Sequence, residues 1–329
     1  MKTALRNASL LVLTLLACVP AQPDPTTLVD LRVLGMSFEP PEIMIPCDAR
    51  LLLGLASAGA DGGTITLDPA LQAQLAAFAS KPLQFTTLIA DPAGKGRQLA
   101  YDALACAKTS DRACDNPGEF VSLKTGQTSA GELAMQVTPG AQFLASGDPL
   151  LLDVVVDDTF KGLGGIRLPV VLDLQALDKT EHIYAQKLMV YSCRFFPSQK
   201  VNVTPVLPGM TWNGEDWPEG EVKQASGTTA VPMLPVDFSM LEEDYVVPSI
   251  MLTPVALHEA WKINWLTTMG VMSSYETGGT DFSGGVGAHT NSWKPDPTAT
   301  TEQDVTFTFV VRDGRGGESW LTRTAHWKP

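Results

Sequence analysis

Short runs of branched and aliphatic residues, bounded by glycine, proline or aspartate, recur along most of this chain of 329 residues. Runs of this length and composition are typical of β-strands. They cover residues 31–38, 50–55, 83–90, 150–156, 167–172 and 187–195, and then 203–212, 245–252, 261–269, 305–312 and 318–327. Their spacing favours antiparallel β-sandwiches over alternating strands and helices.

The segment 68–79 interrupts the strand pattern. Asp68 fits a helix N-cap and Pro69 the first helical position, and three apolar residues then recur at helical spacing. We expect a short amphipathic helix that packs on the sandwich as a lid; the alternative is an element that binds a partner.

Tryptophans divide into two groups. Trp261 and Trp265 share one strand face by the period of two, so we expect both to be buried, with Trp265 in the core. Trp212, Trp217 and Trp293 lie in or beside two predicted long loops, 213–235 and 273–297, which are rich in glycine, proline, serine and threonine. Exposed rings at these places would stack on sugars or anchor a protein partner. A glycine-rich segment, 313–317, predicts a closing hairpin.

The first eighteen residues are similar to a bacterial lipoprotein signal peptide. Lys2 and Arg6 precede an apolar run over 8–16, and Leu15-Leu16-Ala17-Cys18 resembles a lipobox. The apolar run is about half of the roughly 20 residues that a membrane-spanning helix needs. The resemblance implies that Cys18 becomes the first residue and carries covalent lipid, whose chains hold the protein on a bilayer. A plain secretory signal with a chance cysteine is the alternative.

Residues 19–27 contain three prolines and predict an extended tether of about 30 Å. Val19 stands where an aspartate would favour retention in the inner membrane, so we expect an outer-membrane lipoprotein of the bacterial envelope.

Length and charge bound the remaining possibilities. A chain of this length usually divides into two domains, and we predict a signal peptide, a lipidated tether and two domains at residues 1–17, 18–30, 31–200 and 201–329. The formal net charge of −13 repels phosphate backbones, which argues against nucleic acid as a partner.

Four cysteines remain if Cys18 carries lipid, and an even number in an exported chain suggests disulfides. Three pairings are possible. We favour the short loop Cys106–Cys114, which leaves Cys47 with Cys193. A zinc site is the rival, but no pair of cysteines has C-x-x-C spacing.

A search for catalytic groups finds no convincing active site. His258-Glu259 is followed by Lys262 where a zinc metalloprotease needs its second histidine, and no G-x-S-x-G elbow occurs. Acidic residues at 153–158 and 242–244 are explained better as solvated loops than as calcium ligands, since the D-x-D-x-D-G spacing is absent. Asp157 and Asp158 would be the first ligands if calcium bound, and no resident cofactor is predicted.

Several short sequence segments resemble those of the Ig-like or cadherin-like envelope lipoproteins abundant in myxobacteria. They are Leu31–Leu34, Glu39–Glu42, Ile89–Pro92, Asn202–Trp212, Asn264–Leu266, Val310–Gly317 and Trp320. The resemblance implies a mostly β chain with two Ig-like antiparallel β-sandwich domains in tandem and a short helical insertion in the first. The helix and the pair Trp212 and Trp217 depart from the family pattern.

These observations predict a lipid-anchored envelope protein that acts as a non-catalytic binding or structural module. One alternative is a carbohydrate- or peptidoglycan-binding lipoprotein that uses the loop tryptophans of the second domain. A hydrolase with an unrecognised active site is the less favoured alternative. The predicted partners are the membrane, through the lipid, and an unknown envelope protein or glycan.

Overall fold

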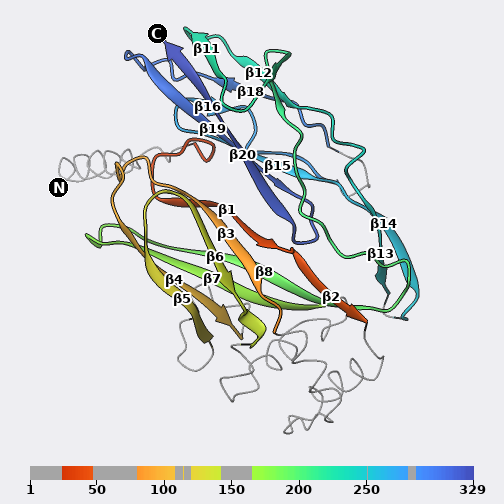
Figure 1. Cartoon of the computed structure of the whole chain (residues 1–329). Helices are drawn as coiled ribbons and strands as arrows, with labels where there is room; N and C mark the ends of the chain where they lie inside the picture. The colour runs from red at the N-terminus through yellow and green to blue at the C-terminus, as the bar shows by residue number, and fades with distance from the viewer. Residues whose placement is uncertain are drawn as a thin grey trace, which may run out of the picture.

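The computed structural model describes residues 24–46, 80–107, 114, 120–141, 165–249, 251–280 and 287–329. These residues form β-strands in several sheets, which confirms the prediction of a mostly β fold. The strands gather into two stacked bodies (Figure 1), an N-terminal unit of β1–β8 and a C-terminal unit of β9–β20. Outside the described residues lie Cys18, Cys47, Asp157, Asp158, the predicted helix at 68–79 and the predicted strands at 50–55 and 150–156.

Two sheets build the N-terminal unit, one in the order β1-β3-β6 and one in the order β2-β8-β7-β4-β5. The strands are β1 (Arg32–Glu39), β2 (Glu42–Pro46), β3 (Leu83–Ala90), β4 (Leu99–Cys106), β5 (Phe120–Thr128), β6 (Gly131–Val137), β7 (Ile166–Ala176) and β8 (His182–Arg194). All pairs are antiparallel except that β2 runs parallel to β8. Pro40 and Pro41 end β1, because proline cannot donate to the ladder, and the chain changes sheet there.

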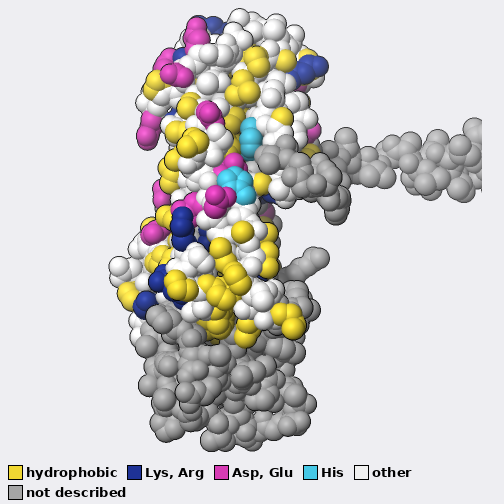
Figure 2. All heavy atoms as spheres, turned by 90° about the vertical axis from the view of Figure 1, so that its right-hand side faces the viewer, with side chains coloured by type: hydrophobic (Ala, Val, Ile, Leu, Met, Phe, Trp, Pro, Cys, Tyr) yellow, Lys and Arg dark blue, Asp and Glu magenta, His cyan; other side chains and the backbone are white. Residues whose placement is uncertain are grey.

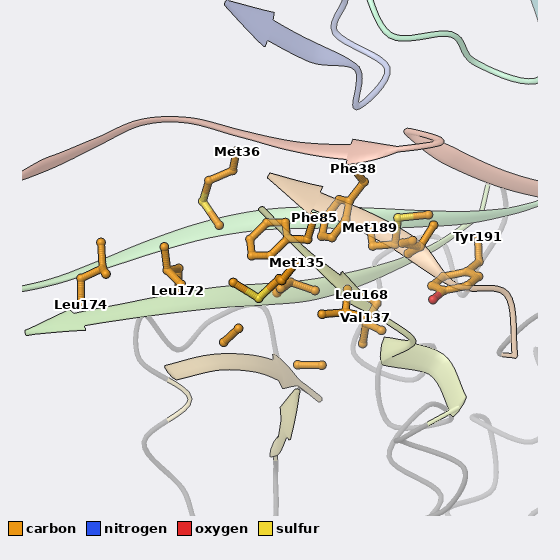
Figure 3. Close-up of a cluster of buried hydrophobic side chains, with 14 of the residues drawn as sticks. Met36, Phe38, Phe85, Met135, Val137, Leu168, Leu172, Leu174, Met189 and Tyr191 are labelled. Atoms are coloured by element: carbon orange, nitrogen blue, oxygen red, sulfur yellow. The ribbon is translucent and has the colours of Figure 1, made fainter. Parts of the chain in front are cut away.

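The core of the N-terminal unit lies between these two sheets (Figure 3). Alternate residues of β3 are buried, as expected for a strand with one face on the core. β7 lies inside its sheet between β8 and β4 and is buried along most of its length. Phe38 and Phe85 are paired on the neighbouring strands β1 and β3, and their rings stack on the core side of this sheet with 4.9 Å between ring centroids.

The C-terminal unit has two five-stranded sheets, β10-β9-β12-β18-β16 and β11-β20-β19-β15-β17, and a separate hairpin of β13 and β14. The strands are β9 (Met210–Trp212), β10 (Glu215–Trp217), β11 (Val222–Ser226), β12 (Val231–Pro235), β13 (Asp244–Pro248), β14 (Pro254–His258), β15 (Lys262–Thr267), β16 (Val271–Met272), β17 (Glu276–Gly278), β18 (Asn291–Lys294), β19 (Gln303–Arg312) and β20 (Glu318–Lys328). β11 runs parallel to β20, and every other pair is antiparallel.

The closing hairpin predicted at 313–317 is confirmed. Asp313 Oδ1 accepts the N–H groups of Arg315, Gly316 and Gly317 at 2.7–3.0 Å and so closes the turn between β19 and β20. Gly314 and Gly316 have φ angles of 78° and 118°, which only glycine adopts without strain.

The long loops predicted at 213–235 and 273–297 are wrong in large part, because β10, β11, β12, β17 and β18 lie there. These strands have only three to five residues, and all except β12 are rich in polar groups, so no long apolar run marked them. β12 is apolar but contains two prolines, which argue against a strand. The strand predicted at 203–212 is confined to Met210–Trp212.

Cys106 and Cys114 form a disulfide, the short pairing favoured from the sequence. Both are buried beside Leu104 and Val171. Cys193 is also disulfide-bonded, and its predicted partner Cys47 lies outside the described residues.

Replacing Cys106 and Cys114 together by alanine is expected to lower the free energy of unfolding by about 2.5 kcal/mol, because the bond restricts the unfolded chain over a short loop. Urea titration followed by circular dichroism measures the change. An unchanged urea midpoint would contradict the prediction.

Candidate binding cleft between the two units

An apolar cluster joins the two units. It comprises Leu28, which precedes β1, and Leu34 in β1 of the N-terminal unit, with Leu266 and Val310 on β15 and β19 of the C-terminal unit. All four are buried, and Trp320 of β20 packs against them. The outer face of one C-terminal sheet is therefore covered by the N-terminal unit, and burial of this apolar area holds the two together.

Gly35 allows the closest approach at this junction. A Cβ atom at this position would lie 2.8 Å from Cε3 of Trp320 and 3.1 Å from Oε1 of Glu318. Any larger residue would push β1 away from β20.

Gly35→Ala is therefore expected to lower the free energy of unfolding by about 1–3 kcal/mol, as overpacking does in other cores. The cost should be smaller in a Trp320→Phe background, where the shorter ring leaves room for the methyl group. Urea titrations of the four chains measure this difference, and an equal cost in both backgrounds would show that Trp320 is not the obstacle.

The residues that precede β1 dock on the C-terminal unit. Leu28 N–H donates to the carbonyl of Thr267 at 2.8 Å, and Thr267 N–H donates to the carbonyl of Thr26 at 2.9 Å. The Thr26 hydroxyl accepts the N–H of Met272 at 3.0 Å. The prediction of an extended tether over 19–27 is wrong at its end, because Thr26 bonds to the last residue of β15 and to Met272 of β16, and the Thr27 hydroxyl donates to the Gly270 carbonyl between them.

The buried carboxylate of Glu318, in the C-terminal unit, contacts polar and charged groups of the N-terminal unit. Its Oε1 accepts the backbone N–H of Met36 at 3.1 Å and lies 2.9 Å from Arg312 Nη2. Its Oε2 lies 2.8 Å from Nζ of Lys187 on β8. A carboxylate of the C-terminal unit is thus neutralised partly by a lysine of the N-terminal unit.

A second network surrounds the guanidinium of Arg315. Nη1 lies 2.9 Å from Glu259 Oε1 and 3.6 Å from Glu243 Oε2, and Nη2 lies 4.0 Å from Glu42 Oε2. The guanidinium carbon lies 4.3 Å from the centre of the Tyr245 ring, a cation–π distance. One cation therefore meets carboxylates from both units.

Asn202 and Asp313 complete this junction. Asn202 donates its backbone N–H to Glu42 Oε2 at 2.8 Å and its side-chain amide to Asp313 Oδ2 at 2.7 Å. Burial raises the pKa of Asp313, while the hydrogen bonds from Asn202 and from backbone N–H groups lower it. Burial also raises the pKa of Tyr245, against the lowering effect of Arg315.

A cleft of about 620 Å³ opens beside these networks. Apolar walls come from β1, β2, β8 and β13, including Met36, Met44, Val190, Val246 and Pro248. Five cations line it, Arg167, Lys187, Lys200, Arg312 and Arg315, against two carboxylates, Glu42 and Glu318. The residues that line this cleft therefore carry more positive than negative charge, although the whole chain has a net charge of −13. The volume of the cleft is within the range of sites that hold small molecules.

Figure 2 views the molecule from the side of β13 and β14. Hydrophobic side chains gather on the lower part of this face, and Lys and Arg side chains lie beside them. Lys200 is exposed at the cleft and forms no ion pair with any described residue.

The three loop tryptophans are not exposed, so that prediction is wrong. Trp212, Trp217 and Trp293 are buried in the core of the C-terminal unit, around Phe307. Each lies in a short strand, β9, β10 or β18, whose inner face the sequence did not reveal. The Asn213-Gly214 turn, with φ angles of 53° and 83°, is the hairpin signal that could have located β9 and β10. Trp261 and Trp265 are buried as predicted.

Other candidate residues lie apart from the cleft or within its networks. His182, His258 and His326 each contact carboxylates at the surface, and carboxylate hydrogen bonds raise the pKa of His326. Glu259 is buried and bonds to Arg315 and Trp261. Among the described residues, no group of three or more His, Cys, Asp or Glu side chains is arranged to hold a metal ion. Across the same residues, no helix has the length and hydropathy to cross a bilayer.

Comparison with known proteins gives no family model and no curated protein that matches. The solved structures with a similar arrangement include the fibronectin(III)-like modules of CbhA from Clostridium thermocellum, at 8% identity and a TM-score of 0.19, covering 76% of this chain and 86% of that one. The D00-D0 domain of intimin has 9% identity and a TM-score of 0.21, covering 76% and 93%. Dimeric latent PorU from Porphyromonas gingivalis has 8% identity and a TM-score of 0.21, covering 91% and 24%. Likeness at this level carries no inference about activity or partners.

Proposed function

We propose that this chain is a lipid-anchored bacterial envelope protein, similar to the Ig-like or cadherin-like lipoproteins of myxobacteria. In this proposal two Ig-like domains in tandem act as a non-catalytic binding or structural module, and Cys18 carries the lipid. The observation that carries it is the buried junction, where apolar packing, Glu318 and Arg315 fix the two units around one cleft.

The two carboxylates of the cleft support a structural role for its charged groups. Glu318 already bonds to Met36, Lys187 and Arg312, and Glu42 accepts bonds from Ser192 and Asn202. Groups held in this way position the units, whereas Lys200 and the apolar wall remain available to a ligand. Because the three loop tryptophans are buried, glycan recognition through them has no support in the fold.

The lipid anchor is tested by growing cells with a clickable palmitate analogue and following the full chain. We expect label on the wild-type chain and none on Cys18→Ser. Label that persists on Cys18→Ser, or an unlabelled wild-type chain, would overturn the anchor.

The cleft is tested with anilinonaphthalene sulfonate, an anion with an apolar ring system that matches the lining. We expect saturable binding that weakens about tenfold in Val246→Asp or Lys200→Glu, since each removes a favourable group and adds a repulsive charge. The matched controls are Val222→Asp and Lys124→Glu, both exposed in strands away from the cleft. Equal weakening in the controls would show that the probe does not bind there.

A further inference from the structure

The β13–β14 hairpin is a two-stranded sheet of its own. Its base is fixed to the rest of the C-terminal unit by Arg315, which pairs with Glu259 at 2.9 Å and lies over the ring of Tyr245. β13 lines the cleft and β14 does not, so the free edge of β14 faces away from the cleft. Two-stranded ribbons are marginal alone, and additional strands stabilise them.

The hydrogen-bonding groups of this edge follow from the register. Ser249 N–H donates to the carbonyl of Thr253, and Glu259 N–H to that of Glu243, so every second pair between them is hydrogen-bonded. Val246↔Ala256 and Asp244↔His258 are the alternate pairs, whose backbone groups point away from the partner strand. The N–H groups of Ala256 and His258 therefore face outward, and they form no hydrogen bond with any described residue.

Exposed apolar side chains surround this edge. On β14 they are Val255 and Leu257, at the tip of the hairpin Met251 and Leu252, and near its base Met240 and Leu241. Met240 and Met251 are 92% and 82% exposed. β14 contains no acidic residue and no lysine, two of the usual protections of an edge strand, and its one proline, Pro254, stands at its first position.

We propose that β14 pairs with β14 of a second copy of this chain, antiparallel about a two-fold axis at Ala256, to give a continuous four-stranded sheet. Ala256 of each copy donates its N–H to the Ala256 carbonyl of the other. His258 N–H of each copy donates to the Pro254 carbonyl of the other, so Pro254, which has no N–H, leaves the accepting groups intact.

The pattern of side chains is self-complementary under this rotation. Val255 of one copy lies opposite Leu257 of the other, and the reverse, so both exposed residues gain an apolar cross-strand neighbour. A strand of five residues spans roughly 17 Å, and antiparallel pairing brings the apolar tip of each hairpin near the apolar base of the other. A two-fold interface requires this self-complementarity.

Charge also favours a second copy at this strand. Two chains of net charge −13 repel each other wherever acids meet. β14 carries no acid; Asp244, across the hairpin, has its carboxylate 2.8 Å from His258 Nδ1, and Glu259, which follows β14, is buried against Arg315. Contact through β14 therefore brings the two acidic chains together without opposing carboxylates.

The test is cysteine crosslinking of the full chain in cells treated with copper phenanthroline, read on a non-reducing gel. In the proposed pair the two Ala256 Cα atoms lie about 5.5 Å apart, within disulfide reach. We expect Ala256→Cys to give about tenfold more disulfide-linked dimer than Thr229→Cys, an exposed position elsewhere on the C-terminal unit. Adding Leu257→Lys should remove the dimer, since it places like charges near the axis. Adding Val222→Lys should leave it unchanged.

Equal crosslinking of Ala256→Cys and Thr229→Cys would overturn the proposal. So would a product that joins Ala256→Cys to a different protein, because the occupant of the edge would then not be a second copy. Dimer that survives Leu257→Lys would show that β14 does not form the contact. Circular dichroism of each variant confirms that the fold is retained.

Discussion

Arg315→Met is expected to lower the free energy of unfolding by about 3–5 kcal/mol, the cost of breaking a buried ion pair from one side. The guanidinium side chain is 11% exposed and faces Glu259, whose side chain is 3% exposed. Methionine fills a similar volume but leaves Glu259, Glu243 and Glu42 close together without a cation. Urea titration at neutral pH measures the loss.

Two further variants separate the effect of charge from that of packing around Arg315, and a third, at Lys262, is an exposed control. Lys262→Met removes an exposed pair with Glu276, at 2.8 Å and with side chains 47% and 41% exposed, and should cost less than about 1 kcal/mol. Glu259→Gln in the Arg315→Met background should recover part of the loss, because it removes one of the carboxylates left unpaired. Arg315→Lys should cost less than Arg315→Met but more than nothing, because lysine keeps the positive charge and loses the planar guanidinium donors and the stacking on Tyr245. Similar losses in Arg315→Met and Lys262→Met would contradict the assignment of Arg315 as the central cation.

The sequence predicted several strands close to their observed bounds. The segment 83–90 matches β3, and the last two strands and their glycine turn match β19 and β20. It did not predict β2, β4, β5 and β6 of the N-terminal unit, nor β14 and most of the short strands of the C-terminal unit. A strand of three residues such as β10 shows less than two full periods of alternation, so its inner face is not visible in the pattern.

The junction could not be predicted because its members are distant in the chain. Glu42, Glu259 and Arg315 come from β2, the end of the β13–β14 hairpin and the β19–β20 turn, and only the folded chain brings them together. The glycine-rich segment around Arg315 was visible in the sequence, but its carboxylate partners were not. Of the acidic residues at 242–244, predicted as solvated, Asp244 is 91% exposed and faces His258. Glu242 accepts the Trp261 N–H at 2.7 Å and Glu243 faces Arg315, contacts that the sequence did not indicate.

Trp293→Ala is expected to cost about 3–5 kcal/mol of unfolding free energy, the range for removing a large buried aromatic side chain. The ring is fully buried, 5.1 Å from the Phe307 ring and 5.9 Å from the Trp212 ring between centroids. Its Nε1–H donates to the Met269 carbonyl at 2.8 Å, so alanine also removes one of the two donors to that carbonyl, which keeps the Thr267 hydroxyl at 2.9 Å.

This variant distinguishes a core residue from a ligand contact. Trp293→Phe keeps a ring against Phe307 and Trp212 and loses only the indole donor and part of the volume, so its cost should be clearly smaller. Tyr275→Ala, at a side chain 46% exposed in the same unit, should change the free energy by less than about 0.5 kcal/mol. Urea titration of the three chains gives the comparison. A ring that served only to hold a glycan would contribute little to folding. A Trp293→Ala chain as stable as the wild type would therefore contradict the assignment of Trp293 to the core and would favour a role in ligand binding.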